Sequence, residues 1–305
     1  MNEEEEKKLN YKKVILVAAI FVAMVLCVYI GLILPKIVKK PSNNVYNNVE
    51  EKQNNEVSNV TEVEPDPELT PEPQAVLQEI KPYPVNTAET IEKVKNIYTS
   101  DYKRVFLTFD DGPSQTVTPQ ILNILDTYNV KATFFVLGSR VEIYPELVRE
   151  EFNRGHYVAN HGYSHKYNLV YASTNAVLDE YTRTENLIRE ALGKSDYYSN
   201  VFRFPGGSNG GKYANLKANA RNVLEQNNVA YLDWNCLTRD AEGSFSKEEL
   251  LQNLIDTSQD KVSIVVLMHD AGTKVTTYEA LPNVIEYFQN NGYVFENLYN
   301  ILGGQ

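Results

Sequence analysis

The stretch VFLTFDDGP, residues 105–113, joins a short apolar run to two carboxylates and a Gly-Pro pair. The run from Val105 to Phe109 has the length and the β-branched and aromatic composition of a buried strand. Gly-Pro turns the chain directly afterwards, so Asp110 and Asp111 stand at the end of that predicted strand. An Asp pair before Gly is common in ordinary turns, and by itself it does not establish a functional site.

Further short apolar runs follow and alternate with longer stretches of helical periodicity. Strands are predicted over Val105–Phe109, Ala132–Leu137, Tyr157–Asn160, Val201–Phe204, Ala230–Trp234, Val262–Met268 and Tyr293–Phe295. Helices are predicted over Pro119–Tyr128, Pro145–Arg154, Thr174–Leu192, Leu216–Asn227, Lys247–Ser258 and Tyr278–Asn290, with a short one near Ala88–Ile97. This alternation indicates an α/β fold, and a parallel (β/α) barrel, complete or incomplete, fits it better than a flat sheet. In either fold the active site gathers at the carboxyl ends of the strands.

A pair of histidines follows one of these strands. The segment NHGYSH, residues 160–165, places His161 and His165 four residues apart in a chain that has 4 histidines. Two imidazoles at this spacing can bind one metal ion, whereas the alternative is a polar surface loop. Together with one Asp of the first group they would form a two-His, one-carboxylate site with open positions for water and substrate.

Three later groups also follow predicted strands. FRFPGGS, residues 202–208, carries Arg203 and a Gly-Gly turn whose N–H groups could face a ligand; an ordinary surface cation is the alternative. Trp234 is the only tryptophan, and two roles are equally consistent with its position: a core residue at a strand end or a residue that stacks on the substrate. His269 closes the most apolar strand and is either a structural residue or a general acid or base. His156 and Cys236 are predicted to be structural.

The charge balance excludes one class of partner. With 29 basic and 40 acidic residues the formal net charge is −11, and no basic stripe is present in residues 96–305. Because phosphate binding needs a basic face, we do not expect nucleic acid as a partner. The oligomeric state cannot be inferred from the sequence.

The first 95 residues differ in composition from the rest. Residues 14–35 form an uncharged apolar run long enough for a transmembrane anchor. Four lysines precede this run and three follow it, which favours a cytoplasmic tail over residues 1–13 and an extracellular catalytic part. Residues 36–95 are predicted to be a disordered spacer, with a short helix near its end, and residues 96–305 a single catalytic domain. The predicted location is therefore the cell membrane, with a single pass.

Taken in order, TFDDGP, His161 with His165, RFPGG, the segment 234–240 and LMH at 267–269 resemble the five motifs of the NodB-type polysaccharide deacetylases, the family 4 carbohydrate esterases. The resemblance runs from about Lys103 to the C-terminus. It implies a distorted (β/α) barrel and metal-dependent hydrolysis of N-acetyl groups on a polysaccharide, a reaction at a carbon–nitrogen bond other than a peptide bond. The favoured substrate is the N-acetylglucosamine of peptidoglycan, with release of acetate.

The resemblance also implies a role for individual residues. The residues expected to hold a divalent metal, commonly zinc and sometimes cobalt or nickel, are Asp111, His161 and His165. The residues expected in proton transfer are Asp110 as general base, Arg203 as its orienting partner, His269 as general acid and Asp240 as the carboxylate that tunes His269. The residues expected to contact substrate are Gly206 through its backbone N–H, Leu267 as the wall for the acetyl methyl, and Trp234.

Three positions depart from the family pattern. Gly162 stands where many members carry Ser or Thr, so a hydrogen bond that supports the metal ligands is expected to be missing. Gly206 replaces a frequent aromatic residue, which predicts a more open groove. Ala241 replaces a frequent Trp, so sugar stacking is expected to pass to Trp234 or to one of the tyrosines.

Other functions stay open on the sequence alone. N-acetylmuramic acid, chitin-like oligomers or an exopolysaccharide are alternative substrates. An anchored protein that binds glycan without turnover is a second class, although retention of all five acidic and histidine site residues argues against it. A non-haem iron oxygenase shares the two-His, one-carboxylate ligand set but leaves Asp110 without a purpose.

Overall fold

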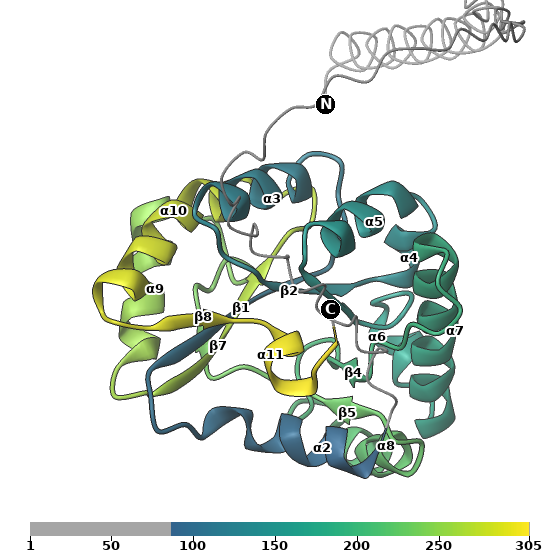
Figure 1. Ribbon diagram of the computed structural model, residues 1–305. Helices are drawn as coiled ribbons and strands as arrows, with labels where there is room; N and C mark the ends of the chain where they lie inside the picture. The colour runs from purple at the N-terminus through teal and green to yellow at the C-terminus, as the bar shows by residue number, and fades with distance from the viewer. Residues whose placement is uncertain (1–86, 305) are drawn as a thin grey trace, which may run out of the picture. The chain divides into compact units, whose positions relative to one another are not determined.

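A computed structural model describes residues 87–304 (Figure 1). The predicted tail 1–13, the predicted anchor 14–35 and the predicted spacer up to residue 86 lie outside the described residues. Within residues 87–304 no helix is both long and apolar enough to cross a bilayer.

The strands form one parallel sheet in the order β5-β4-β3-β2-β1-β7-β6, with β8 also paired to β1. Their bounds are β1 Arg104–Asp110, β2 Thr133–Val136, β3 Tyr157–Asn160, β4 Val201–Phe202, β5 Ala230–Tyr231, β6 Cys236–Leu237, β7 Ser263–His269 and β8 Val294–Glu296. The order ends at β5 and β6, which are not paired with each other in the described part of the chain. The result is a curled, incomplete (β/α) barrel, as the alternation of strands and helices predicts (Figure 1).

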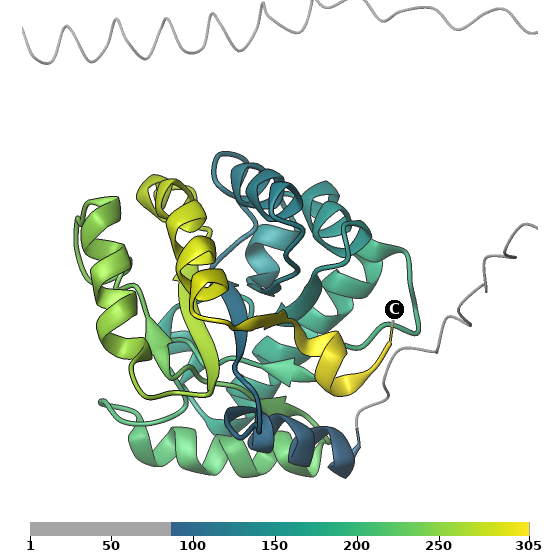
Figure 2. The same cartoon turned by 60° about the vertical axis from the view of Figure 1, so that its left-hand side comes forward.

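Helices surround the sheet, and Figure 2 shows several of them side by side along its outer surface. Their bounds are α2 Ala88–Lys95, η1 Asn96–Tyr98, α3 Thr118–Thr127, α4 Gly138–Val141, α5 Pro145–Asn153, α6 Tyr167–Val170, α7 Thr174–Leu192, α8 Ala214–Gln226, α9 Lys247–Ser258, α10 Val275–Asn290 and α11 Leu298–Leu302. Ser246 and Glu249 form a capping box at the start of α9.

Strand β1 lies at the centre of the sheet and divides the core in two. Its residues alternate between faces, so Val105, Leu107 and Phe109 join the cluster beneath the outer helices. Phe106 points the other way and packs with Val94 and other residues of α2, η1 and α11. These short elements fill the amino-terminal end of the barrel interior, and the carboxyl end is left for polar side chains.

All seven predicted strands and all seven predicted helices are present, with ends that differ by a few residues at most. The two-residue strand β6 and the short helices α4, α6 and α11 were not predicted, because each is too short to show a period. Helix α2 lies inside the range 36–95 assigned to the spacer and packs against β5 and α11. For residues 87–95 the spacer assignment is therefore wrong, and the folded part begins before residue 96.

Candidate active site

The end of β1 places two carboxylates in different positions. Asp110 is the last strand residue and is buried, whereas Asp111 adopts a positive φ of 74° and is partly exposed. The turn that follows requires glycine at position 112, because an added Cβ would lie 2.0 Å from Oδ2 of Asp270. Both carboxylates approach Nε2 of His161, Asp111 at 3.5 Å and Asp110 at 3.8 Å, but they differ in burial and in their other partners.

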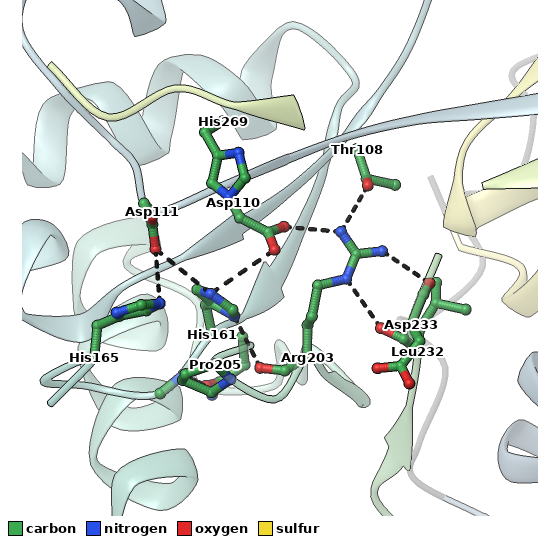
Figure 3. A network of polar contacts seen from close by, with 12 residues as sticks. Thr108, Asp110, Asp111, His161, His165, Arg203, Pro205, Leu232, Asp233 and His269 are labelled. Carbon is green, nitrogen blue, oxygen red and sulfur yellow. Dashed lines mark hydrogen bonds and ion pairs between the residues drawn. The ribbon is translucent and has the colours of Figure 1, made fainter. Parts of the chain in front are cut away.

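Asp111, His161 and His165 form one cluster (Figure 3). Oδ1 of Asp111 lies 3.5 Å from Nε2 of His161 and 3.4 Å from Nε2 of His165. Ligand atoms of a tetrahedral site with metal bonds near 2.0–2.1 Å are about 3.3 Å apart, so these separations suit a shared ion. Oδ1 of Asp111 is buried and has no hydrogen-bond partner among the described residues. The donor set therefore fits a divalent metal.

The protonation of His161 also suits a ligand. Its Nδ1 lies 2.8 Å from the carbonyl oxygen of Arg203, which can only accept, so Nδ1 carries the proton and Nε2 keeps its lone pair for the cluster. Burial lowers the pKa of His161 to about 3, which keeps the ring neutral.

The loop that carries both histidines is held from α7. The Glu180 carboxylate accepts hydrogen bonds from the backbone N–H groups of Tyr163 and Ser164 at 2.6 and 2.7 Å, and from the Ser164 hydroxyl at 2.7 Å. Gly162 has no side chain to make the hydrogen bond expected at that position, and the loop is supported by Glu180 through the neighbouring residues instead. Glu180 was not found from the sequence, because a carboxylate on a helix face gives no sign of the loop that approaches it.

Asp110 is paired with Arg203, which is fully buried. Nη1 of Arg203 donates to Oδ1 of Asp110 at 2.8 Å and to Thr108 at 2.6 Å, while its other nitrogens donate to the carbonyls of Leu232 and Asp233 (Figure 3). Burial raises the pKa of Asp110, and the charges of Arg203 and His269 oppose that rise. Arg203 is thus no surface cation: it fixes the orientation of Asp110.

His269 ends β7, beside Asp110 in the parallel register. Its Nδ1 lies 2.8 Å from Oδ1 of Asp240, and its backbone N–H donates to Oδ2 at 2.8 Å. Burial lowers the pKa of His269, but the hydrogen bond and charge of Asp240 outweigh it and raise the pKa to about 9. His269 therefore carries a proton in the neutral pH range.

The loop at Gly206 is fixed on two sides. Lys217 donates to the carbonyls of Gly206 and Gly207 at 3.3 and 2.6 Å, and Tyr171 donates to the carbonyl of Pro205 at 2.6 Å. A Cβ added to Gly206 would lie 2.3 Å from the hydroxyl oxygen of Tyr167. The expectation of a more open groove at this position is therefore wrong, because Tyr167 fills the space.

The two remaining substrate-contact candidates lie near this site. Leu267 is buried on β7, two residues before His269 and so on the same side of the strand. Trp234 is partly buried, packs against the inner core cluster and lies beside Gly207. The structure thus brings every predicted site residue to the carboxyl ends of the strands. His156 and Cys236 are buried away from the cluster, His156 accepting a hydrogen bond from the Ala132 N–H.

Comparison with known proteins agrees with this arrangement. Residues 98–231 match the family described as polysaccharide deacetylase. Over 203 residues the chain is 32% identical to a peptidoglycan-N-acetylglucosamine deacetylase of Bacillus cereus, which covers 64% of this chain and 68% of that protein. The chain belongs to the polysaccharide deacetylase family.

Two further members of the family are similar to this chain. The peptidoglycan-N-acetylglucosamine deacetylase PgdA of Listeria monocytogenes is 32% identical over 204 residues, covering 66% of this chain. The chain spans only 39% of the length of that relative. The crystal structure of the catalytic domain of peptidoglycan N-acetylglucosamine deacetylase from Eubacterium rectale matches with a TM-score of 0.60 and 36% identity, covering 66% of this chain and 90% of that one.

Proposed function

We propose that this chain hydrolyses the N-acetyl groups of a cell-wall polysaccharide, with the N-acetylglucosamine of peptidoglycan as substrate and acetate as product. One observation carries the proposal: a two-His, one-carboxylate cluster lies beside a carboxylate held by a buried arginine, and a histidine held protonated by a buried aspartate is the register neighbour of that carboxylate. The three relatives described above are all named as deacetylases of that sugar polymer.

The cluster of Asp111, His161 and His165 is proposed to hold zinc, the metal whose usual ligand number and bond lengths match the spacing of these atoms, while cobalt or nickel would suit the same donors. When bound, the ion lowers the pKa of a water molecule and polarises the acetamide carbonyl.

The proposed proton transfers use the two buried pairs. Asp110, oriented by Arg203, takes a proton from the attacking water. The Gly206 backbone N–H donates to the developing oxyanion of the tetrahedral intermediate. His269, kept protonated by Asp240, delivers its proton to the departing sugar amine so that the carbon–nitrogen bond can break.

The remaining parts of the proposal concern substrate contacts and location. Leu267 is proposed to receive the acetyl methyl, and Trp234 to contact the sugar chain beside Gly207. The apolar run 14–35, if it spans the membrane, would place the catalytic domain outside the cell within reach of the wall.

Acetate release by the purified full-length chain tests the proposal. The chain is incubated with peptidoglycan and with chito-oligosaccharides, before and after treatment with a chelator and again after zinc is restored. Acetate that disappears with chelator and returns with zinc supports the proposed reaction, and the faster substrate identifies the polymer. Folded, zinc-loaded protein that releases no acetate from either glycan contradicts the proposed activity on those polymers.

A further inference from the structure

Tyr167, on the short helix α6, lies where the side chain of residue 206 would otherwise be. An added Cβ at Gly206 would lie 2.3 Å from the Tyr167 hydroxyl oxygen and 3.1 Å from its ring carbon Cζ. Gly206 also has a φ of 70°, which favours glycine independently. The hydroxyl of Tyr167 is therefore seated against the backbone of the Gly206 loop.

A second tyrosine forms a hydrogen bond between helix α6 and this loop. The buried Tyr171 donates its hydroxyl to the Pro205 carbonyl at 2.6 Å. The rings of Tyr167 and Tyr171 pack edge to face, with centroids 5.7 Å apart. Because Tyr171 anchors the helix and Tyr167 packs on Tyr171, the ring of Tyr167 is held in a defined place.

The other side of Tyr167 faces the metal-ligand cluster. Its ring centroid lies 5.8 Å from that of His165. Tyr167 is 43% exposed, and within residues 87–304 its hydroxyl has no hydrogen-bond partner. It thus presents both an aromatic surface and a free donor next to the site.

From this placement we infer that Tyr167 forms one wall of the groove for the acetylated sugar, its ring packing against the pyranose and its hydroxyl donating to the sugar beside Gly206. The inference rests on the proposed function for the kind of ligand. The aromatic ring of tyrosine can pack against the C–H surface of a sugar, and its hydroxyl can form a hydrogen bond with a sugar hydroxyl.

Binding of chitotetraose by the zinc-loaded full-length chain tests the inference in an Asp110→Asn background, which slows turnover during the measurement. Adding Tyr167→Ala is expected to weaken binding by at least about 10-fold, because ring and donor are both lost. Adding Tyr167→Phe is expected to weaken it by roughly 3- to 10-fold, the effect of one lost hydrogen bond. Zinc content is expected to be the same in all variants.

Tyr198 provides a matched control. It is 38% exposed and precedes β4, so it lies at the opposite end of the strands from the site. Tyr198→Ala is expected to leave the affinity unchanged. Equal affinities for the parent and the Tyr167→Ala variant overturn the inference, and so does an Asp110→Asn parent that binds no chitotetraose. Acetate release by the wild-type chain is measured separately. A failure of the proposed reaction is thereby distinguished from a failure of the proposed contact between Tyr167 and the sugar.

The contact between Tyr167 and Gly206 has its own test. Gly206→Ala introduces both backbone strain and a collision with the Tyr167 hydroxyl. In a Tyr167→Ala background only the strain remains, so the same substitution is expected to weaken binding less there than in the parent. Equal effects in the two backgrounds overturn the proposed packing.

Discussion

The imidazole of His269 lies 2.8 Å from the carboxylate of Asp240, and the same carboxylate accepts hydrogen bonds from the His269 backbone N–H and from Thr277. Burial raises the pKa of Asp240, but the hydrogen bonds and charge of His269 lower it by more than burial raises it. The net pKa of Asp240 is therefore below its usual value. Asp240 therefore stays ionised and keeps His269 protonated up to about pH 9.

This pairing predicts the alkaline limit of activity. A general acid with a pKa of about 9 is active below that pH and fails as the pH rises through it. Asp240→Asn removes the largest cause that raises the pKa of His269, while burial continues to lower it, so the alkaline limb of kcat/KM is expected to move down by more than about one pH unit. Thr277→Val removes only one of three hydrogen bonds and is expected to shift it less. An unchanged limb in Asp240→Asn would contradict the assignment of His269.

The two adjacent aspartates are expected to respond differently to substitution. Asp110→Asn removes the proposed general base, so turnover is expected to fall by roughly 10²- to 10⁴-fold. Zinc is expected to be retained, because Asp110 lies outside the metal cluster and Asn keeps its shape. His161→Ala removes a ligand, and zinc and turnover are expected to be lost together. Metal analysis of the two purified variants beside acetate release separates the roles. A metal-free Asp110→Asn variant would show that the division between Asp110 and Asp111 is wrong.

The strands that position the site could be predicted because each is a continuous apolar run followed by a polar residue. Val105–Phe109 and, within the second predicted strand, Ser263–Met268 are buried on both faces, so their composition alone marks them as parallel strands. Strand β6 could not be found in this way. It consists of Cys236 and Leu237, and it exists because these residues pair with Val266 and Leu267.

The same distinction separates predicted from missed site residues. The residues predicted as metal ligands and proton carriers lie at strand ends or within five residues after them, so the fold brings them together. Glu180 and Tyr167 contact loops that are distant from them in sequence. Neither residue lies in a sequence pattern that would indicate these contacts. Resemblance to a family indicated which side chain position 206 lacks, but not that Tyr167 occupies the space.

Glu180 is expected to support metal affinity without touching the ion. Its carboxylate holds the backbone of Tyr163 and Ser164, between the two histidine ligands. Glu180→Ala removes all three hydrogen bonds and is expected to weaken zinc binding by roughly 10- to 100-fold, with Glu180→Gln intermediate. Competition with a chromogenic chelator measures the affinity. Glu190→Ala, an exposed change on the same helix, is the control. Affinity in Glu180→Ala equal to wild type, in a folded protein, would refute this role.

Glu151 on α5 is expected to make the stability of the folded domain depend on pH. It is fully buried, and neither carboxylate oxygen has a hydrogen-bond partner among the described residues. Burial raises its pKa well above 4.5, and the charge of Asp270 raises it further. The unfolded chain releases this proton above about pH 4.5, whereas the folded chain must keep it or bury a charge. The contribution of Glu151 to stability is therefore lost as the pH rises from 4.5 toward its folded pKa.

Replacing Glu151 by Gln removes the ionisable group and keeps its shape. The variant is expected to unfold near the wild-type temperature at pH 4, and several degrees above it at pH 8, with roughly 3 °C for each kcal/mol. Glu146→Gln is the control, since this residue lies on the same helix and is exposed. Thermal unfolding at both pH values measures the difference. A gain that is the same at pH 4 and pH 8 would mean that packing, and not ionisation, limits stability at this position.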